Sequence, residues 1–248
     1  MTKTVLITGC SSGLGRTTTA HFAENGWNVI ATMRKPDPEL ELAYPDRVLV
    51  EALDVTDPKS IEAAIAAGIG RFGGLDAIVN NAGFTMLSIF EATPMEEVRR
   101  MFETNVFGVM NVVQAAIPAL RAVGGGNIIN VTSGVGIAAQ PLLSLYVSSK
   151  QAVEGLSESL SYELESQNIR MRIIEPGAMR TTNFTATGMV ASQGASLPDG
   201  YKVYFDHALQ AMINYPFADT PEQAVAETIL HAAADTSERL RYPVGPDA

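Results

Sequence analysis

The sequence predicts an α/β protein whose parallel sheet is doubly wound, with helices on both faces, in three layers. Short apolar runs rich in β-branched residues recur along the chain and alternate with amphipathic helical stretches. Some of these runs, such as Ala77-Ile78-Val79, do not alternate with polar residues, which is typical of central strands covered by helices on both faces. The two observations together indicate parallel βαβ units.

The strands and helices can be placed in order along the chain. Strands are expected at 5–8, 28–32, 48–53, 77–79, 127–131 and 170–174, with a last one at Arg239–Tyr242, which makes about seven. A helix from Gly13 to Asn25 should stop at Gly26, and Asp57-Pro58 supplies an N-cap and a first-turn proline for a helix to Arg71. Because connections between parallel strands are right-handed, we expect a Rossmann-like sheet with a ligand crevice at the strands' carboxyl ends.

The length favours one domain over residues 1–248, within the range of single α/β domains. A long segment, 181–220, breaks the strand and helix pattern with glycines, prolines and small polar residues around a helical piece at Tyr201–Ile213. Since it follows the sixth strand, we expect it to form a substrate-binding lid.

Composition excludes several function classes. The net charge of -10 leaves no general basic surface for nucleic acid. One cysteine, Cys10, allows no intrachain disulfide, and three scattered histidines form no recognisable zinc motif, so no metal is expected. The N-terminus lacks the pattern of a secretory signal, and no apolar stretch approaches the roughly 20 residues that span a bilayer. A cytoplasmic enzyme without a membrane partner is the expectation.

A glycine-rich turn, Thr8-Gly9-Cys10-Ser11-Ser12-Gly13-Leu14-Gly15, joins the first strand to the first helix. Glycines let the backbone approach a pyrophosphate, and the helix N-terminus presents free N–H groups to the anion. The expected phosphate contacts are Gly9, Ser11, Ser12, Gly13, Leu14 and Gly15. A purely structural turn is the alternative, but the TGxxxGxG spacing resembles that of the short-chain dehydrogenase/reductase family.

Three further segments match that family and extend the resemblance over roughly residues 3 to 182. Asn80-Asn81-Ala82-Gly83 resembles the family's NNAG element beside the cofactor, although an ordinary polar turn could have the same residue types. Asp54-Val55 matches the aspartate that binds the adenine amino group, although Asp54 could instead cap the next helix. Pro176-Gly177 with Met179 and Thr181 resembles PGxxxT, which implies contacts with the nicotinamide.

Tyr146 and Lys150 are spaced i and i+4, which places them on one helical face. Ser133 and Asn105 stand where the resemblance puts the family's catalytic serine and helix-kinking asparagine. Each could be an ordinary structural residue; jointly they imply catalysis. Hydride delivery to a carbonyl carbon leaves negative charge on oxygen, which requires a proton donor and a fixed hydrogen bond.

The expected roles follow from this chemistry and from the resemblance. Tyr146 is the general acid in reduction and the base in oxidation, and Ser133 binds the substrate oxygen. Lys150 is expected to lower the pKa of Tyr146 and to hold the nicotinamide ribose. The resemblance implies that Asn105 kinks its helix, so that a backbone carbonyl there holds a water connecting Lys150 to solvent.

The cofactor is expected to be NADP(H) rather than NAD(H). NAD-preferring enzymes place an acid at the end of the second strand, where this chain has Met33 followed by Arg34 and Lys35. A guanidinium there favours a 2'-phosphate through charge-assisted hydrogen bonds. The alternative is that Arg34 and Lys35 are solvated loop charges.

The substrate is expected to be a hydrophobic ketone or secondary alcohol. The expected cleft residues are Met86, Phe90, Ala138, Leu142, Met179 and Phe184, with Ser133 and Tyr146 at the reacting oxygen. The GCSSGLGR and VIATMR segments are similar to those of steroid, retinol and lipid reductases of the family, such as 17β-hydroxysteroid and retinol dehydrogenases. The alternatives are a noncatalytic NADP(H)-binding regulator and an epimerase or dehydratase. The resemblance also implies a homodimer or homotetramer.

Overall fold

In this computed structural model, which describes residues 2–179, 197–216 and 219–248, seven strands form one parallel sheet. The strands are β1 (Thr4–Thr8), β2 (Asn28–Met33), β3 (Val48–Ala52), β4 (Ala77–Asn80), β5 (Gly126–Val131), β6 (Ile169–Pro176) and β7 (Arg241–Val244). Their order is β3-β2-β1-β4-β5-β6-β7, so the winding reverses between β1 and β4. A doubly wound sheet binds its ligands at such a point, outside the carboxyl ends of the strands.

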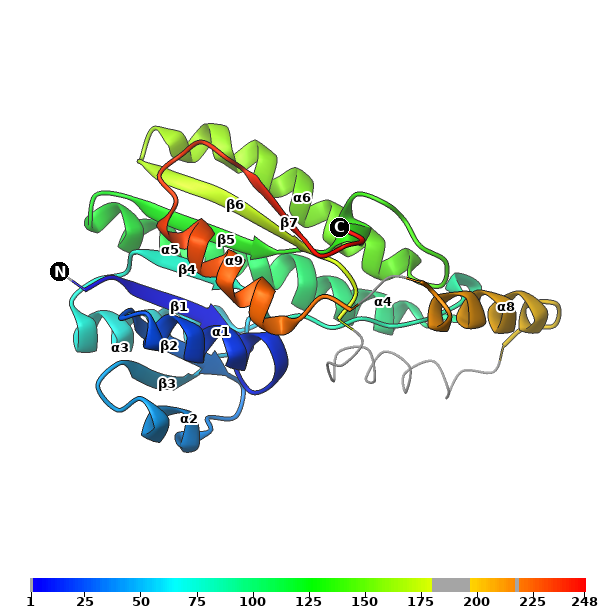
Figure 1. The fold of residues 1–248 in the computed structure, drawn as a ribbon, viewed down its shortest axis with the longest axis horizontal. Coiled ribbons are helices and arrows are strands. Elements are labelled where there is room, and N and C mark those ends of the chain that lie inside the picture. The colour runs from blue at the N-terminus through cyan, green and yellow to red at the C-terminus, as the bar shows by residue number, and fades with distance from the viewer. Residues whose placement is uncertain (1, 180–196, 217–218) are drawn as a thin grey trace.

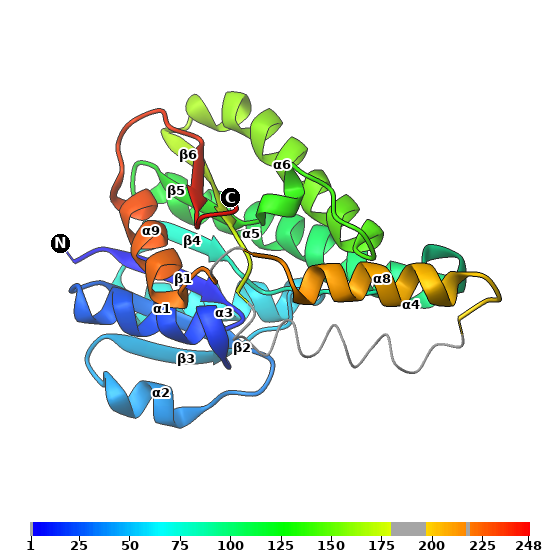
Figure 2. The same cartoon turned by 45° about the vertical axis from the view of Figure 1, so that its right-hand side comes forward.

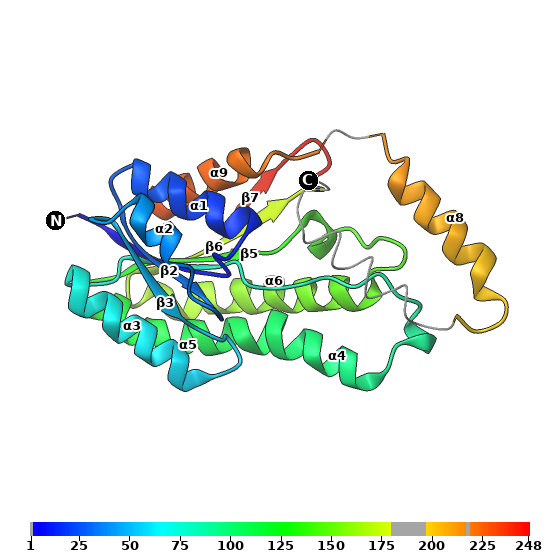
Figure 3. The ribbon, with the colours of Figure 1, turned by 90° about the horizontal axis from the view of Figure 1, so that it is seen from below.

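The helices form the two outer layers, which confirms the predicted three-layer fold (Figures 1 and 3). One face is covered by α1 (Gly13–Glu24) and α9 (Glu222–Ala234), and the other by α3 (Pro58–Phe72), α5 (Gly108–Ala122) and α6 (Ser144–Glu165). The shorter segments are α2 (Pro38–Ala43), α4 (Met95–Phe102), the 3-10 turns η1 (Phe90–Ala92) and η3 (Gly134–Gly136), and a π-helical turn, η2 (Glu103–Phe107). The remaining helix, α8 (Tyr201–Ile213), matches the predicted helical piece and extends beyond the carboxyl ends of the strands (Figure 2).

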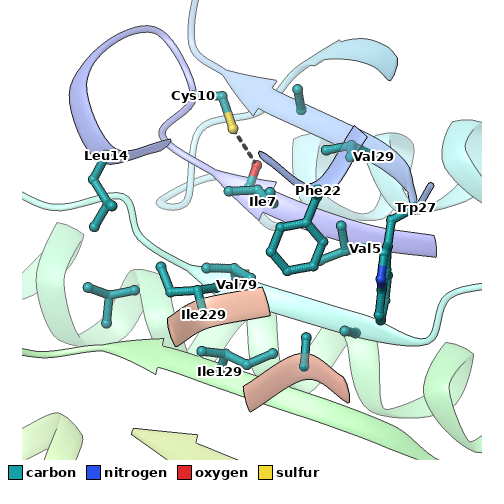
Figure 4. Close-up of a cluster of buried hydrophobic side chains, with 14 of the residues drawn as sticks. Val5, Ile7, Cys10, Leu14, Phe22, Trp27, Val29, Val79, Ile129 and Ile229 are labelled. Atoms are coloured by element: carbon teal, nitrogen blue, oxygen red, sulfur yellow. Dashed lines mark hydrogen bonds between the residues drawn. The ribbon is translucent and has the colours of Figure 1, made fainter. Parts of the chain in front are cut away.

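Side chains of the central strands are buried on both faces, which explains their continuous apolar sequences. Along β1, Val5 and Ile7 point into the core under α1 and α9, whereas Leu6 points into the core under α3 and α5. Figure 4 shows the first of these cores, where the rings of Phe22 and Trp27 pack edge to face with centroids 5.2 Å apart. The apolar runs therefore mark central strands that are covered by helices on both faces.

The last strand lies two residues later than the sequence predicts. We expected Arg239–Tyr242, but β7 runs from Arg241 to Val244 and includes Pro243. The carbonyl oxygen of Leu240 accepts from the N–H of Ile173 in β6, and that of Val244 accepts from the N–H of Gly177, directly after β6. Since alternate residues of a strand face opposite neighbours, Pro243 faces the open side, where its missing N–H leaves the ladder intact.

A buried arginine fastens the loop that leads into β7. Arg172 on β6 is only 1% exposed. Its guanidinium donates to the carbonyl oxygens of Asp235 at 2.9 Å, Ser237 at 2.6 Å and Arg239. The charge thus satisfies three backbone acceptors between α9 and β7, and these contacts hold the edge strand in register.

We expect Arg172→Met to lower the melting temperature by roughly 6 to 12 °C. Without the guanidinium, three backbone carbonyls lose their hydrogen-bond donor, which lowers the free energy of unfolding by about 3 kcal/mol. Each kcal/mol shifts Tm by about 2 to 4 °C in a chain of this size. Arg170→Met, two positions earlier on β6, is the matched control for lost charge. Calorimetry that finds equal shifts for the two variants would contradict the role given to Arg172.

Candidate active site

The glycine-rich turn has the geometry that its sequence predicts. Gly9 and Gly13 adopt positive φ angles of 76° and 54°, a conformation that glycine tolerates best. Ser12 is the N-cap of α1, and its side chain makes no capping hydrogen bond within the described part of the chain. The first N–H groups of α1 therefore remain for an anion, and the turn fits a pyrophosphate.

Close packing holds this turn against the loop after β4. A Cβ on Gly15 would overlap the carbonyl oxygen of Gly9 and lie 2.7 Å from Nδ2 of Asn81. That Nδ2 donates to the carbonyl oxygens of Thr8 at 2.9 Å and Gly9 at 3.3 Å, and the N–H of Ala82 donates to Oγ1 of Thr8 at 3.0 Å. The NNAG segment thus shapes the turn directly.

Asn80 stabilises the centre of the sheet and faces away from this turn. It is 4% exposed, and its Nδ2 donates to Oδ1 of Asn130 at 2.8 Å. Nδ2 of Asn130 donates in turn to Oγ of Ser157 on α6, also at 2.8 Å. In the neighbouring Gly83, a Cβ would lie 3.2 Å from Oδ1 of Asn105, so this glycine permits a close approach to the asparagine.

The residues after β2 and β3 lie together at the same edge. Asp54 accepts from the N–H and the hydroxyl of Thr56, so it closes its own turn, while Asp57 caps α3. The pKa of Asp54 is lowered, first by the N–H of Thr56 and also by the charge of Arg34. Val55 is buried against Gly108 of α5.

Arg16 is a basic residue at this edge that our sequence analysis missed. It pairs with Asp37 at 2.7 Å, beside the exposed Arg34 and Lys35. Its position directly after Gly15 was the available signal. Two arginines therefore flank the region where the sequence predicts the 2'-phosphate, and Asp37 already neutralises one of them.

Ser133, Tyr146 and Lys150 come together at the carboxyl end of β5. Ser133 follows β5, and its hydroxyl is close enough to the phenol of Tyr146, near the start of α6, to lower the pKa of that phenol. Nζ of Lys150 donates to the carbonyl oxygen of Val131 at 2.8 Å and lies 5.6 Å from the centre of the Tyr146 ring. The predicted trio is thus one cluster, with the lysine over the tyrosine ring.

Asn105 sits in the π-helical turn between α4 and α5, which agrees with the expected kink. Its Oδ1 accepts from the N–H of Phe84 at 3.1 Å, and its Nδ2 donates to the carbonyl of Phe84 at 2.8 Å and to Oγ of Ser149 at 3.2 Å. The side chain therefore connects α6, the π turn and the loop after β4. Ser149, inside the YxxxK segment, was not predicted.

Burial dominates the electrostatics of the cluster. It raises the pKa of Tyr146, and the hydrogen bond with Ser133 opposes that shift. Burial lowers the pKa of Lys150 to about 8, and the negative charge of Glu154 opposes this lowering. We expected Lys150 to bring the pKa of Tyr146 below its ordinary value; in the protein alone that pKa is raised instead, because desolvation of the phenolate is the largest effect and Ser133 offsets it only in part.

The Pro176-Gly177 turn follows β6 and lies beside the cluster. Oγ of Ser133 is 3.5 Å from the carbonyl oxygen of Pro176. The carboxylate of Asp247 accepts from the N–H of Ala178 at 3.1 Å and packs so closely on Gly177 that no Cβ would fit there. Asp247 escaped our sequence analysis because it is distant in sequence and belongs to no motif.

The expected substrate residues separate into two groups. Met86 and Leu142 are buried in one apolar cluster with Tyr146, against which Phe205 and Leu209 of α8 pack. Phe90 is 60% exposed, Ala138 is also exposed, and Met179 packs on the core under α1 and α9. Thr181 and Phe184 lie outside the described residues, as does much of the expected lid, 181–220.

Fold and site together define an oxidoreductase, in which a dinucleotide-type turn and a Ser-Tyr-Lys cluster share one edge of a parallel sheet. A family model for short chain dehydrogenases matches residues 3–189. The uncharacterized oxidoreductase YusZ of Bacillus subtilis is 37% identical over 254 residues, which cover 98% of this chain and 89% of YusZ. The chain belongs to the short-chain dehydrogenase/reductase family.

Two solved structures agree with this assignment. A short-chain dehydrogenase from Streptomyces avermitilis has a TM-score of 0.85 at 32% identity, over 100% of this chain and 89% of that one. ElxO, solved with NADP bound, has a TM-score of 0.80 at 26% identity over 98% of both chains. In the described ranges, no His, Cys, Asp and Glu side chains group as metal ligands would, and no helix has the length and apolar character to cross a membrane.

Proposed function

We propose that this chain is an NADP(H)-dependent reductase that interconverts a hydrophobic ketone or aldehyde with its alcohol. The observation that carries the proposal is that Ser133, Tyr146 and buried Lys150 come together at the carboxyl end of β5, at the same sheet edge as the glycine-rich turn. Proton donor, oxygen-binding hydroxyl and phosphate cradle lie where one substrate and one dinucleotide can meet. This favours catalysis over the regulator alternative, which requires no such trio.

The cofactor would be held along the switch point of the sheet. The turn from Gly9 to Gly15 would bind the pyrophosphate, and Asp54 the adenine. Asn81, Ala82 and Gly83 would border the ribose. Lys150 would donate to the ribose hydroxyls, and the Pro176-Gly177 turn, with Met179 and Thr181, would border the nicotinamide. The cofactor would supply the hydride.

The residues around the substrate oxygen would then complete the reduction. Ser133 donates a hydrogen bond to that oxygen and fixes its position beside Tyr146. As negative charge develops on the oxygen, Tyr146 transfers its phenolic proton. An ordinary phenol already carries this proton at neutral pH, and burial, which raises the pKa of Tyr146, makes its loss harder still. Lys150 places positive charge beside the phenolate that results.

The cluster of Met86, Leu142 and Tyr146 supports an apolar substrate, because it continues into the apolar side chains of α8. A steroid, retinoid or lipid carbonyl suits such a wall. Assembly into a dimer or tetramer and a cytoplasmic location stay predictions. Exposed apolar side chains such as Phe107 and Tyr162 on the helices near Asn105 and Tyr146 support assembly.

Loss of NADPH absorbance across aromatic, steroid and aliphatic ketones tests the proposal. Turnover of any ketone, absent from Tyr146→Phe, supports it and begins to name the substrate. NADPH binding without turnover across the panel would favour the regulator, and product formation without NADPH consumption would favour an epimerase or dehydratase.

Arg34→Ala is expected to raise the KM for NADPH about tenfold and to leave the KM for NADH unchanged. A charge-assisted hydrogen bond to the 2'-phosphate is worth about 1.5 kcal/mol, and about 1.4 kcal/mol is a factor of ten. Lys35→Ala, which removes the neighbouring exposed charge, is the control. If Arg34→Ala raises the KM values for NADPH and NADH equally, Arg34 does not bind the 2'-phosphate.

A further inference from the structure

A buried carboxylate lies one helical turn beyond Lys150. Glu154 follows Lys150 by four residues on α6, so both side chains occupy one face of the helix. Lys150 is 8% exposed and Glu154 is 6% exposed. Buried glutamates are rare unless they are paired, so the surroundings of this one must explain it.

Within the described ranges, one oxygen of Glu154 is paired and the other is not. Oε2 lies 3.2 Å from Nη2 of Arg241, whereas Oε1 is buried and has no hydrogen-bond partner among the described residues. Oε1 also lies 3.2 Å from the place that a Cβ on Gly136 would take, in the turn that begins at Ser133. Glu154 is therefore packed between the active-site turn and the edge strand.

The other charges around Glu154 come from three elements. From β7, Arg241 also pairs with Glu158 of α6 at 2.8 Å and with Glu175 of β6 at 3.1 Å. Burial and the charge of Glu154 raise the pKa of Glu175. Arg241 places positive charge beside Glu154, and Glu175 is a second carboxylate close to it. The titratable neighbours of Lys150 are Glu154 and Tyr146, both on α6.

We propose that Glu154, paired with Arg241 and buried one helical turn from Lys150, is a positioning residue whose negative charge keeps Lys150 protonated for catalysis. The inference rests on the proposed function, because it assigns Lys150 a charged role in the reaction. Burial alone drives Lys150 toward its neutral form. A neutral amine would give up the positive charge beside Tyr146 and one N–H donor toward the ribose.

The sign of the effect is fixed. Burial lowers the pKa of Lys150 to about 8, and Glu154 opposes that shift. Glu154→Gln removes the negative charge and nearly keeps the shape, so Lys150 must lose its proton at a lower pH. Any activity that needs charged Lys150 must then decline at a lower pH on the alkaline side of its profile.

Glu158→Gln is the matched control. Glu158 belongs to the same helix and pairs with the same Arg241, but it lies one turn further from Lys150, and its side chain is 53% exposed. Glu154→Asp keeps the charge, and Glu154→Met removes it without burying an amide that lacks a partner. The methionine variant keeps the test available if the glutamine variant does not fold.

The decisive measurement is an NMR titration of the lysine side-chain carbons in the full chain, with the Lys150 signal assigned by its loss in Lys150→Met. We expect the midpoint of Lys150 to fall by on the order of 1 pH unit in Glu154→Gln and in Glu154→Met. In Glu158→Gln and Glu154→Asp it should stay near the parent value. An unchanged midpoint in the two neutral variants, or an equal fall in Glu158→Gln, would overturn the inference.

The pH profile of kcat/KM for ketone reduction by NADPH gives the second readout. Its alkaline limb should move to lower pH with the Lys150 midpoint, whereas a merely structural loss would lower the profile without moving it. An unmoved limb in an active Glu154→Gln enzyme counts against the inference. If the parent reduces no ketone, the proposed function fails, and the titration still decides whether Glu154 controls the charge of Lys150.

Discussion

Tyr146→Phe is expected to reduce kcat/KM for ketone reduction by about 10² to 10⁴-fold, the contribution usual for a positioned general acid. The substitution removes the phenolic proton that would reach the substrate oxygen, and it leaves the ring in its apolar cluster with Met86 and Leu142. NADPH binding should therefore persist, because the glycine-rich turn and Lys150 are untouched. Steady-state kinetics together with NADPH fluorescence titration separate the two effects.

Tyr162→Phe is the matched control for this loss. Tyr162 lies on the same helix, α6, but is 81% exposed, so its hydroxyl has no part in the cluster. Its variant should keep the parent activity. If Tyr146→Phe retains most of the activity, the acid must be another group, and the role assigned to the Ser133–Tyr146 pair is wrong.

Gly15→Ala is expected to weaken NADPH binding by more than about a hundredfold, or to prevent stable folding. Alanine is favoured over glycine within a helix by about 1 kcal/mol, so propensity alone predicts a gain in stability. At Gly15, however, the methyl group would overlap the carbonyl of Gly9 and press on Asn81. Both neighbours shape the phosphate turn, so accommodating the methyl group must displace the N–H groups that bind the anion.

Gly70→Ala on α3 provides the opposite expectation. A Cβ on Gly70 meets no atom within 4 Å, so the variant should show only the gain from propensity. Thermal unfolding with and without NADPH distinguishes the two sites. If Gly15→Ala binds NADPH as the parent does, the close packing around the turn is not what shapes the cofactor site.

The sequence could predict the fold because its signals are local. The apolar runs that fill both cores, the Asp57-Pro58 start of α3 and the glycine after α1 all act within a few residues. The strand at Arg241–Val244 was misplaced because a proline usually ends a strand, and only its edge position makes it compatible with β7.

The site was predictable only where motifs carry it. Spacing and resemblance were enough to find the glycine-rich turn, the Ser133, Tyr146 and Lys150 cluster, and Asn105. The structure brings these residues to one edge of the sheet. Asp247 contacts Ala178 and Arg241 pairs with Glu154, but both are distant from these partners in sequence. No motif or residue spacing predicts either contact. The pKa of Tyr146 depends on how deeply the packed chain buries the phenol, which no motif encodes.

Pro243 has a consequence for how the molecule behaves in a crowded solution. An edge strand with unpaired N–H groups is a template on which other chains can add strands and begin to aggregate. Pro243 lies exposed on the outer side of β7 and has no N–H to offer there. An incoming strand could not form a continuous ladder along this edge, so the sheet is protected against growth at its C-terminal strand.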